Sequence, residues 1–194
     1  MSLAVDRNLR RTEVAEAAYD IVATQGLDML TIRAVAKAKG CSTAIVSHYF
    51  ADRQDLLSAV YRLASERTFT RWKTVEAAGG DLCACLREVL PTDTDMRQYW
   101  RVYFSFWGRV GMDPELGSIH SEMLERSKAN VRRIIARDPL FSRFEGIDPE
   151  SVIRQILALH AGIATQAAIS ETYWPADQQI ADLESGLAKL LAVG

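Results

Sequence analysis

A chain of 194 residues with 48% hydrophobic and 25% charged residues has the composition of an ordinary globular protein and is long enough to bury a sizeable core. Its formal net charge of −2 excludes a strongly basic protein that binds nucleic acid through total charge alone. The N-terminus MSLAVDRNLRR lacks the apolar central block of a secretory signal, and no run of eighteen apolar residues occurs. We therefore expect a soluble, cytoplasmic protein with no membrane association.

The first part of the chain predicts three helices followed by a long one. Apolar residues at helical spacing mark a first helix that should end at Gly26. Thr31 is placed to cap a short second helix, IRAVAKAK, which should end at Gly40. Ser42 is placed to cap a third helix of about two turns. After a cap at Asp52, a long helical pattern continues until the stretch AAGGD at 77–81.

Longer helices are expected beyond this break. Glycine and proline positions divide the remainder into helices at about 81–90, 94–110, 114–137, 149–171 and 177–192. No strand-like alternation, internal repeat or low-complexity segment is present. The sequence therefore predicts an all-α protein of about nine helices, with a helix-turn-helix domain over residues 1–53 and a larger bundle over residues 54–194 that begins with the long helix.

Two short helices joined by a tight turn that contains Gly40 are typical of a helix-turn-helix, whose second helix enters the major groove of DNA. If Val46 points inward, the helical step of 100° turns Ala44 and His48 outward, with Ile45 and Ser47 beside them. The residues expected to contact bases or phosphates are Thr31, Ser42, Thr43, Ala44, Ile45, Ser47, His48, Tyr49 and Arg53.

The positions of the basic residues are consistent with DNA binding, although the net charge of the chain is not. Arg7, Arg10 and Arg11 cluster near the start of the chain, and Arg33 and Lys37 share one helix face. Many helical proteins contain a similar helix pair and bind no DNA, so a helical adaptor that binds only protein is an alternative. That alternative leaves Arg33, Thr43 and Arg53 without a role.

The stretch TIRAVAKAKGCSTAIVSHYFADRQDLL resembles the signature of the tetracycline-repressor (TetR) family, and STAIVSHYF within it is most similar to the choline-responsive repressors of the BetI type. The resemblance implies that Arg33, Thr43, Ala44 and Ile45 contact bases and that Ser47, Tyr49 and Arg53 hold phosphates. Lys39 and Cys41 depart from the family pattern, which usually has small or apolar residues on either side of the glycine.

The aromatic stretch YWRVYFSFWGRVGMDPEL resembles the regulatory domain of the same subgroup and implies a small-molecule effector. The predicted pocket residues are Trp100, Tyr103, Phe104, Trp107 and His160. Aromatic faces attract quaternary ammonium ions, whereas their helical spacing is also typical of a core face. In ALHAGIATQAAIS at 158–170, Ala161, Ala164 and Gln166 replace the Asp, aromatic and Arg of the family pattern, so we expect an effector other than choline.

The resemblance also implies a homodimer in which the last two helices of each subunit form a four-helix interface. Two apolar stripes predict the interface residues, namely Ile156, Leu159, Ile163 and Ala167 on one helix and Leu183, Leu187 and Leu190 on the other. Either stripe is also suited to the core of a single chain. A two-fold dimer would present two recognition helices to a pseudo-palindromic operator. The resulting expectation is a transcriptional regulator that an effector releases from its operator.

An enzyme is the other alternative, and the sequence offers little for it. His120 with Glu122, or His160 with Glu171, has no accompanying nucleophile or metal set. No phosphate loop, zinc signature or nucleophile elbow occurs. The pair Cys83 and Cys85 would need metal ligands from elsewhere in a chain with three histidines. We therefore expect no catalytic site, no metal and no cofactor.

Overall fold

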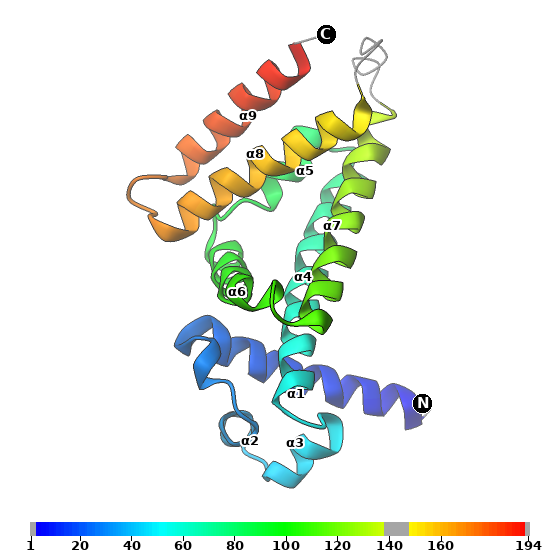
Figure 1. The fold of residues 1–194 in the computed structure, drawn as a ribbon, viewed down its shortest axis with the longest axis vertical. Coiled ribbons are helices and arrows are strands. Elements are labelled where there is room, and N and C mark those ends of the chain that lie inside the picture. The colour runs from blue at the N-terminus through cyan, green and yellow to red at the C-terminus, as the bar shows by residue number, and fades with distance from the viewer. Residues whose placement is uncertain (1–2, 138–147, 193–194) are drawn as a thin grey trace. The chain divides into compact units, whose positions relative to one another are not determined.

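The computed structural model describes the backbone of residues 3–137 and 148–192 and the side chains of residues 8–137 and 148–191. These parts of the chain contain nine α-helices and one short 3₁₀ helix, and no strand occurs among them (Figure 1). The all-α prediction is therefore confirmed. The elements in chain order are α1 (Leu3–Gln25), η1 (Leu27–Met29), α2 (Ile32–Lys39), α3 (Thr43–Tyr49), α4 (Arg53–Ala77), α5 (Leu82–Glu88), α6 (Thr94–Val110), α7 (Pro114–Ile135), α8 (Pro149–Ile169) and α9 (Ala176–Ala192).

The chain forms two compact units, and helices α4, α6 and α7 contribute residues to both. The first unit, which we call the head unit, comprises residues 1–67 and 101–119; the second, the bundle unit, comprises residues 68–100 and 120–194. The head unit thus includes more than the predicted DNA-binding domain, because the end of α6 and the start of α7 belong to it. The boundary after residue 53 stays a prediction about function.

The ends of the short helices follow from local backbone chemistry. The amide of Ala34 donates to the hydroxyl of Thr31 over 3.0 Å, which caps α2 as predicted. Gly40 ends this helix with a φ of 62°, a left-handed conformation that glycine adopts without strain. The carboxylate of Asp52 accepts from the amide of Asp55 over 2.9 Å, so its predicted role as the cap of α4 is confirmed.

The core of the head unit is built from α1, α2, α3 and the beginning of α4. Helix α1 packs against both α2 and α3, and α2 packs against α3. Fully buried side chains from each of these elements meet there, namely Ala18, Tyr19, Leu30, Val35, Val46, Phe50 and Leu56. This shared core fixes the angle at which α3 is held.

The bundle unit is built around α8, which packs against α9. The close approach of the two helices depends on Gly186, because a Cβ atom at that position would lie 2.6 Å from Leu159 Cδ2. By length and composition alone α8 is apolar enough to cross a membrane, yet seven of its residues are buried inside the chain, as in a core helix. Its remaining residues are half-buried or exposed in this chain.

Candidate functional site

Helix α3 presents almost all of its side chains to solvent. Val46 is completely buried, as the sequence predicts, whereas Ile45 keeps 49% of its surface exposed. The other exposed residues of this helix are Thr43, Ala44, Ser47 and His48, and Tyr49 is half-buried. A single inward side chain with an outward set of small, apolar and hydroxyl groups suits a helix that reads base edges in a groove. Their contact with DNA stays a prediction.

Ser42 occupies the N-cap position of α3, but its hydroxyl makes no capping hydrogen bond. The prediction of a side-chain cap is therefore wrong. The physical reason is that the amide of Ile45, which a capping hydroxyl would accept from, donates to the backbone carbonyl of Ser42 over 3.1 Å. The serine is exposed and its hydroxyl is left for an external partner.

Arg53 is held by the protein itself. Its Nε donates to the carbonyl of Leu30 over 2.8 Å, and its Nη2 donates to the carbonyl of Leu27 over 2.9 Å. These bonds tie the start of α4 to η1 and to the residue before Thr31. The phosphate contact expected of Arg53 stays a prediction. The two hydrogen bonds could not be foreseen, because the carbonyls lie more than twenty residues away and carry no side-chain signal. The geometry gives Arg53 a structural role in positioning α2 and α3.

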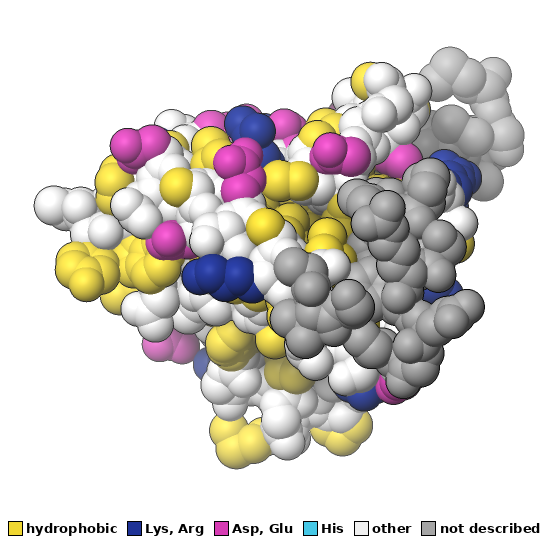
Figure 2. Space-filling model, turned by 90° about the horizontal axis from the view of Figure 1, so that it is seen from above, with side chains coloured by type: hydrophobic (Ala, Val, Ile, Leu, Met, Phe, Trp, Pro, Cys, Tyr) yellow, Lys and Arg dark blue, Asp and Glu magenta, His cyan; other side chains and the backbone are white. Residues whose placement is uncertain are grey.

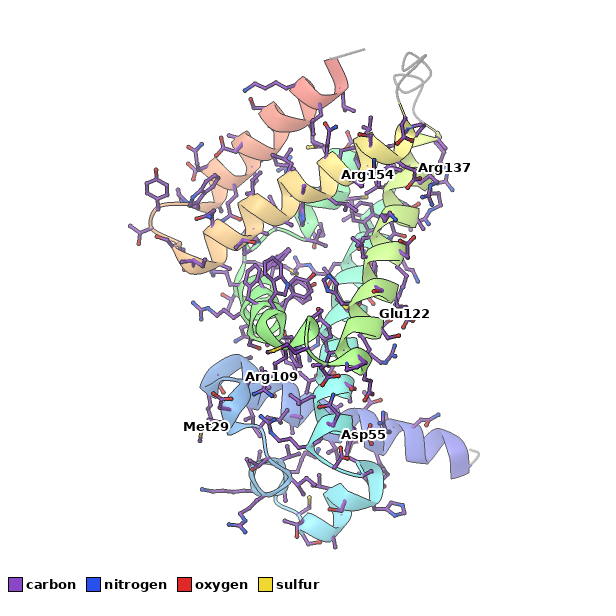
Figure 3. The ribbon with its side chains drawn as sticks, in the orientation of Figure 1. Met29, Asp55, Arg109, Glu122, Arg137 and Arg154 are labelled. Atoms are coloured by element: carbon purple, nitrogen blue, oxygen red, sulfur yellow. The ribbon has the colours of Figure 1, made fainter. Side chains whose placement is uncertain are left out.

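A second arginine that the sequence analysis did not single out for a contact also organises the head unit. Arg11 Nη2 lies 2.6 Å from Asp55 Oδ1, and its Nε donates to the carbonyl of Tyr49 over 3.3 Å. The guanidinium also lies 4.5 Å from the centre of the Phe50 ring. The second oxygen of Asp55 accepts from the amide of Ala51 over 3.2 Å. Arg11 therefore joins α1 to the end of α3 and to α4, and Figure 3 labels Asp55 at this junction.

The basic residues of the head unit divide into paired and unpaired ones. Arg10 pairs with Glu13 at 3.3 Å, and Lys39 lies 3.7 Å from the same carboxylate. Arg33 and Lys37 are exposed, one turn apart on α2, and have no ion-pair partner among the described side chains. The side chain of Arg7 lies outside the described residues. Two free positive charges on α2 are therefore available to a polyanion that meets α3.

The end of α6 and the start of α7 are bonded to the rest of the head unit at two points. Gln54 Nε2 donates to Asp113 Oδ2 over 2.6 Å, and Asp113 also accepts from the amides of Glu115 and Leu116 at the start of α7. Arg109 lies 3.3 Å from Asp28 of η1. Figure 3 labels Arg109 close to Met29, the last residue of η1. Arg109 therefore connects α6 with η1, whose Leu27 carbonyl also accepts a hydrogen bond from Arg53.

Two of the predicted pocket residues, Trp100 and His160, are satisfied core residues of the bundle unit. The indole Nε1 of Trp100 donates to the carbonyl of Val89 over 2.9 Å. The imidazole Nε2 of His160 lies 3.1 Å from the carbonyl of Leu86, to which it donates. Burial lowers the pKa of His160 to about 4, so the ring is neutral at pH 7, and its centre lies 5.8 Å from that of the Trp100 ring.

The other three, Tyr103, Phe104 and Trp107, belong to an aromatic cluster of the head unit. Phe104 and Trp107 meet edge to face at 4.8 Å, and Tyr103 meets Trp107 in the same manner at 5.7 Å. Tyr61 of α4, which the sequence analysis missed, lies 5.8 Å from Tyr103 and stacks on Phe106 at 4.7 Å. Its signal in the sequence is weak because a tyrosine at a core position of a long helix is common.

The predicted dimer residues mostly face the inside of the chain. Ile156, Ile163, Ala167, Leu183 and Leu187 are all buried without any partner subunit. Leu159 is half-buried against Gly186, and Leu190 is half-buried on α9. Apart from Pro149 and Ile169 at the two ends of α8, the exposed positions of the two helices are small, polar or charged residues on other faces, including Ala158, Gly162, Gln166, Ala181, Ser185 and Ala188. The sequence left open whether these two apolar stripes form a dimer interface or the core of one chain. In the structure, most of their residues lie in the core of one chain.

No group of His, Cys, Asp and Glu side chains that could hold a metal ion occurs within the described residues. Cys83 and Cys85 lie on α5, one half-buried and the other buried. Burial raises the pKa of Cys85 to about 11, which makes it an unreactive thiol. Neither cysteine contributes to the surface formed by α2 and α3.

Comparisons with known proteins agree with this geometry. Residues 14–60 match the family model of bacterial regulatory proteins of the tetR family, and residues 80–192 match the model of the BetI-type transcriptional repressor C-terminal region. The regulator PksA of Bacillus subtilis is 26% identical over 85% of this chain and 82% of its own length. The regulator BetI of Burkholderia ambifaria is 29% identical, with 84% of both chains covered.

Solved structures show the same fold. A transcriptional regulator from Rhodococcus superposes with a TM-score of 0.81 at 24% identity and covers 94% of this chain and 96% of its own. A regulator from Saccharomonospora viridis, solved in complex with choline, gives a TM-score of 0.79 at 20% identity, with coverage of 90% and 93%. The regulators of this family are not enzymes. The chain belongs to the TetR family of DNA-binding transcriptional regulators, with a C-terminal region of the BetI type.

Proposed function

We propose that this regulator represses transcription by binding a pseudo-palindromic operator as a homodimer and leaves it when an effector binds. The observation that carries the DNA-binding part is the exposure of α3, in which Val46 alone is buried. Thr43, Ala44 and Ile45 are the base-reading residues of this proposal, since hydroxyls reach base edges and apolar groups contact thymine methyls. Ser47, Tyr49 and the amides at the start of α2 contact phosphates.

Arg33 and Lys37 supply charge to the same surface. Both are exposed and unpaired among the described residues, whereas most other cations of the head unit are engaged by carboxylates or carbonyls. Arg33, near the start of α2, matches a base-contacting position of the family. Local placement of positive charge lets a protein with a net charge of −2 bind DNA.

The incompletely covered surface of α8 supports the homodimer. Ala158 and Gly162 of α8 are exposed one turn apart, and Ile169 at the end of the helix is 74% exposed, so α8 has surface that a second copy of the chain can cover. Figure 2 shows one face of the molecule, on which hydrophobic side chains are exposed among acidic and basic ones. The proposed interface uses the small exposed residues Ala158 and Gly162 of α8 and Ala181 and Ser185 of α9, which permit close helix packing.

Effector release requires that a ligand bind two conformations of the protein with different affinities. The contacts of Gln54 with Asp113 and of Arg109 with Asp28 link α6 to the start of α4 and to η1. A ligand that moves α6 therefore moves the segment on which α2 and α3 are mounted. Choline is bound by the Saccharomonospora viridis regulator, but the residues at 161, 164 and 166 argue for a different effector here.

The test is selection of genomic fragments by the purified protein, followed by binding measurements on the site that emerges. We expect a pseudo-palindrome bound with nanomolar affinity. Ile45→Ala should weaken binding by about 1–3 kcal/mol and relax preference at one position of each half-site, because one apolar base contact is lost. Exposed Met29→Ala, on η1, is the matched control and should bind like the wild type. Weak binding that is indifferent to sequence would instead favour the protein-binding adaptor.

A further inference from the structure

Two serine hydroxyls of α4 are buried inside the head unit without a hydrogen-bond partner among the described residues. Ser58 is 5% exposed and Ser65 is 3% exposed, and both Oγ atoms are shielded from solvent. A serine or threonine in a helix can satisfy itself by donating to the carbonyl four residues earlier, as Thr74 of the same helix does to Thr70 over 3.0 Å. Ser58 and Ser65 do not, and a buried unpaired hydroxyl is unfavourable.

The two hydroxyls share one face of α4. Positions seven apart lie almost directly above one another, separated by about 10 Å along the helix axis. Tyr61 lies between them in the sequence, and its ring stacks on Phe106 at 4.7 Å and lies 5.8 Å from Tyr103. The serines therefore lie about one turn before and one turn after Tyr61 on α4, and we call the rings of Tyr61, Tyr103 and Phe106 the aromatic wall.

The aromatic wall is uncharged. Burial raises the pKa of Tyr103, and the hydrogen bonds with Trp107 and Tyr61 only partly oppose this effect, so the phenol is neutral at pH 7. Among the described residues, no charged side chain contributes to that shift. A ligand placed against this wall meets ring surfaces and hydroxyl groups.

We propose that the effector site of this protein lies along α4 between Ser58 and Ser65, and that it takes an uncharged, flat aromatic molecule with a hydrogen-bonding group at each end. The proposal rests on the effector-released function proposed above and names the chemistry of the effector. Both hydroxyls are unpaired among the described residues. A ligand that pairs them favours a conformation in which α6 has moved away from this face of α4.

The probes are para,para′-biphenol, which carries a hydroxyl at each end of two rings, biphenyl, which has the same rings and no hydroxyl, and choline, which is cationic. Binding is measured by calorimetry on the full chain and on Ser58→Ala, Ser65→Ala and the double variant. We expect biphenol to bind more tightly than either other probe, with a loss of about tenfold for each serine removed. Ser127→Ala is the control, because that hydroxyl already donates to the carbonyl of Met123 over 3.0 Å.

The alanine variants should fold at least as well as the wild type, since each removes an unpaired buried group. Thermal unfolding without ligand checks this, and Ser58→Cys and Ser65→Cys provide a second set of similar size with weak hydrogen-bonding capacity. Equal binding of biphenyl and biphenol, tighter binding of choline, or unchanged affinity in the double variant would each overturn the proposal. The last result is also expected if the serines merely hold buried water.

Operator binding separates this proposal from the proposed function. If the wild type binds biphenol through the serines and no genomic fragment is bound specifically, the ligand site stands and the regulatory function fails. If an operator is bound tightly and biphenol does not bind, the ligand site fails and the regulatory function stands. Release of the operator by biphenol, lost in the double variant, supports both.

Discussion

Arg33 and Arg53 are both basic residues beside the predicted DNA surface, but the structure gives them different chemistry. Arg33 is exposed and unpaired among the described side chains, whereas Arg53 donates to the carbonyls of Leu27 and Leu30. A cation that neutralises a phosphate releases counterions on binding, whereas one that holds two carbonyls stabilises the fold. The two roles therefore predict different responses to substitution.

We expect Arg33→Ala to weaken operator binding, to lower the slope of log affinity against log salt by about one unit, and to leave stability unchanged. Arg53→Ala should leave this slope unchanged and reduce the free energy of unfolding by about 2 kcal/mol, because two charge-assisted hydrogen bonds are lost. Salt titrations of DNA binding and urea unfolding of both variants check this. A reduced salt slope in Arg53→Ala at full stability would show that Arg53 contacts phosphate after all.

His160 makes the stability of the bundle unit depend on pH. Its pKa of about 4 in the folded chain lies below the usual value of 6.5, because burial disfavours the imidazolium. The unfolded chain therefore binds the proton more strongly. The stabilisation is complete above about pH 6.5, falls as the pH drops, and is lost once the pH passes below about 4, for a total on the order of 3 kcal/mol.

We expect His160→Gln to flatten this dependence, since a glutamine amide can donate to the Leu86 carbonyl and does not titrate between pH 4 and pH 7. Unfolding measured at half-unit steps across that range checks the slope. His48→Gln, at an exposed position, is the control and should retain the wild-type slope. An unchanged slope in His160→Gln would assign the pH dependence to other groups.

At the scale of elements, the hydrogen bond from Gln54 to Asp113 joins α4 to the turn between α6 and α7. Gln54→Leu removes it and leaves the bonds from Asp113 to the start of α7 intact. We expect operator affinity without ligand to change little. The coupling between biphenol and operator binding should fall by about 0.5–2 kcal/mol, because movement of α6 is passed to α4 less completely.

Operator titrations with and without biphenol measure this coupling, and Gln25→Leu, at the exposed end of α1, is the control. Full coupling in Gln54→Leu would show that the movement passes through other contacts. Complete loss of DNA binding would show that Gln54 contributes to the fold of the head unit and not to communication within it.

Most element boundaries were predictable because their signals are local. Gly26 and Gly40 end α1 and α2, Thr31 and Asp52 cap the helices that follow, and the predicted start of α6 matches the structure. The short η1 was missed, since three residues are too few to show a period. The predictable part of the candidate site was the orientation of α3, which a single buried valine fixes.

The unpredicted part of the site depends on contacts between distant residues. Arg11 and Asp55 are 44 positions apart, and the partners of Arg53 are backbone carbonyls. Neither contact leaves a trace in the local sequence. The faces of α8 and α9 were ambiguous for a related reason: apolar residues at helical spacing show that a face is buried but do not identify the chain that buries it.

At the scale of the whole molecule, substitutions of two glycines separate dimerisation from stability. A Cβ atom at Gly162 of α8 would meet nothing within 4 Å, whereas one at Gly186 of α9 would collide with Leu159. Gly162→Glu should keep the fold, with some gain in helix stability, and should abolish the proposed dimer by placing charge in its interface. Operator affinity should then fall by at least about tenfold, because the two half-sites are no longer bound together.

Analytical ultracentrifugation of Gly162→Glu checks the oligomeric state, and circular dichroism checks the fold. Gly111→Glu is the control, because that glycine is exposed in the turn after α6 and its Cβ also meets nothing within 4 Å. A dimer that persists in Gly162→Glu would place the interface elsewhere on the surface. Gly186→Ala should instead lower stability, since Leu159 would have to move.

The attachment of α3 through one buried valine has a consequence for how this protein and its relatives diverge. Since Thr43, Ala44, Ile45, Ser47 and His48 contribute little to the core, we expect substitutions there to change the DNA sequence that is recognised and to cost almost no stability. Gene duplicates can therefore acquire new operators by single substitutions without first accumulating stabilising ones. The effector chemistry and the recognised operator are then free to evolve separately within one fold.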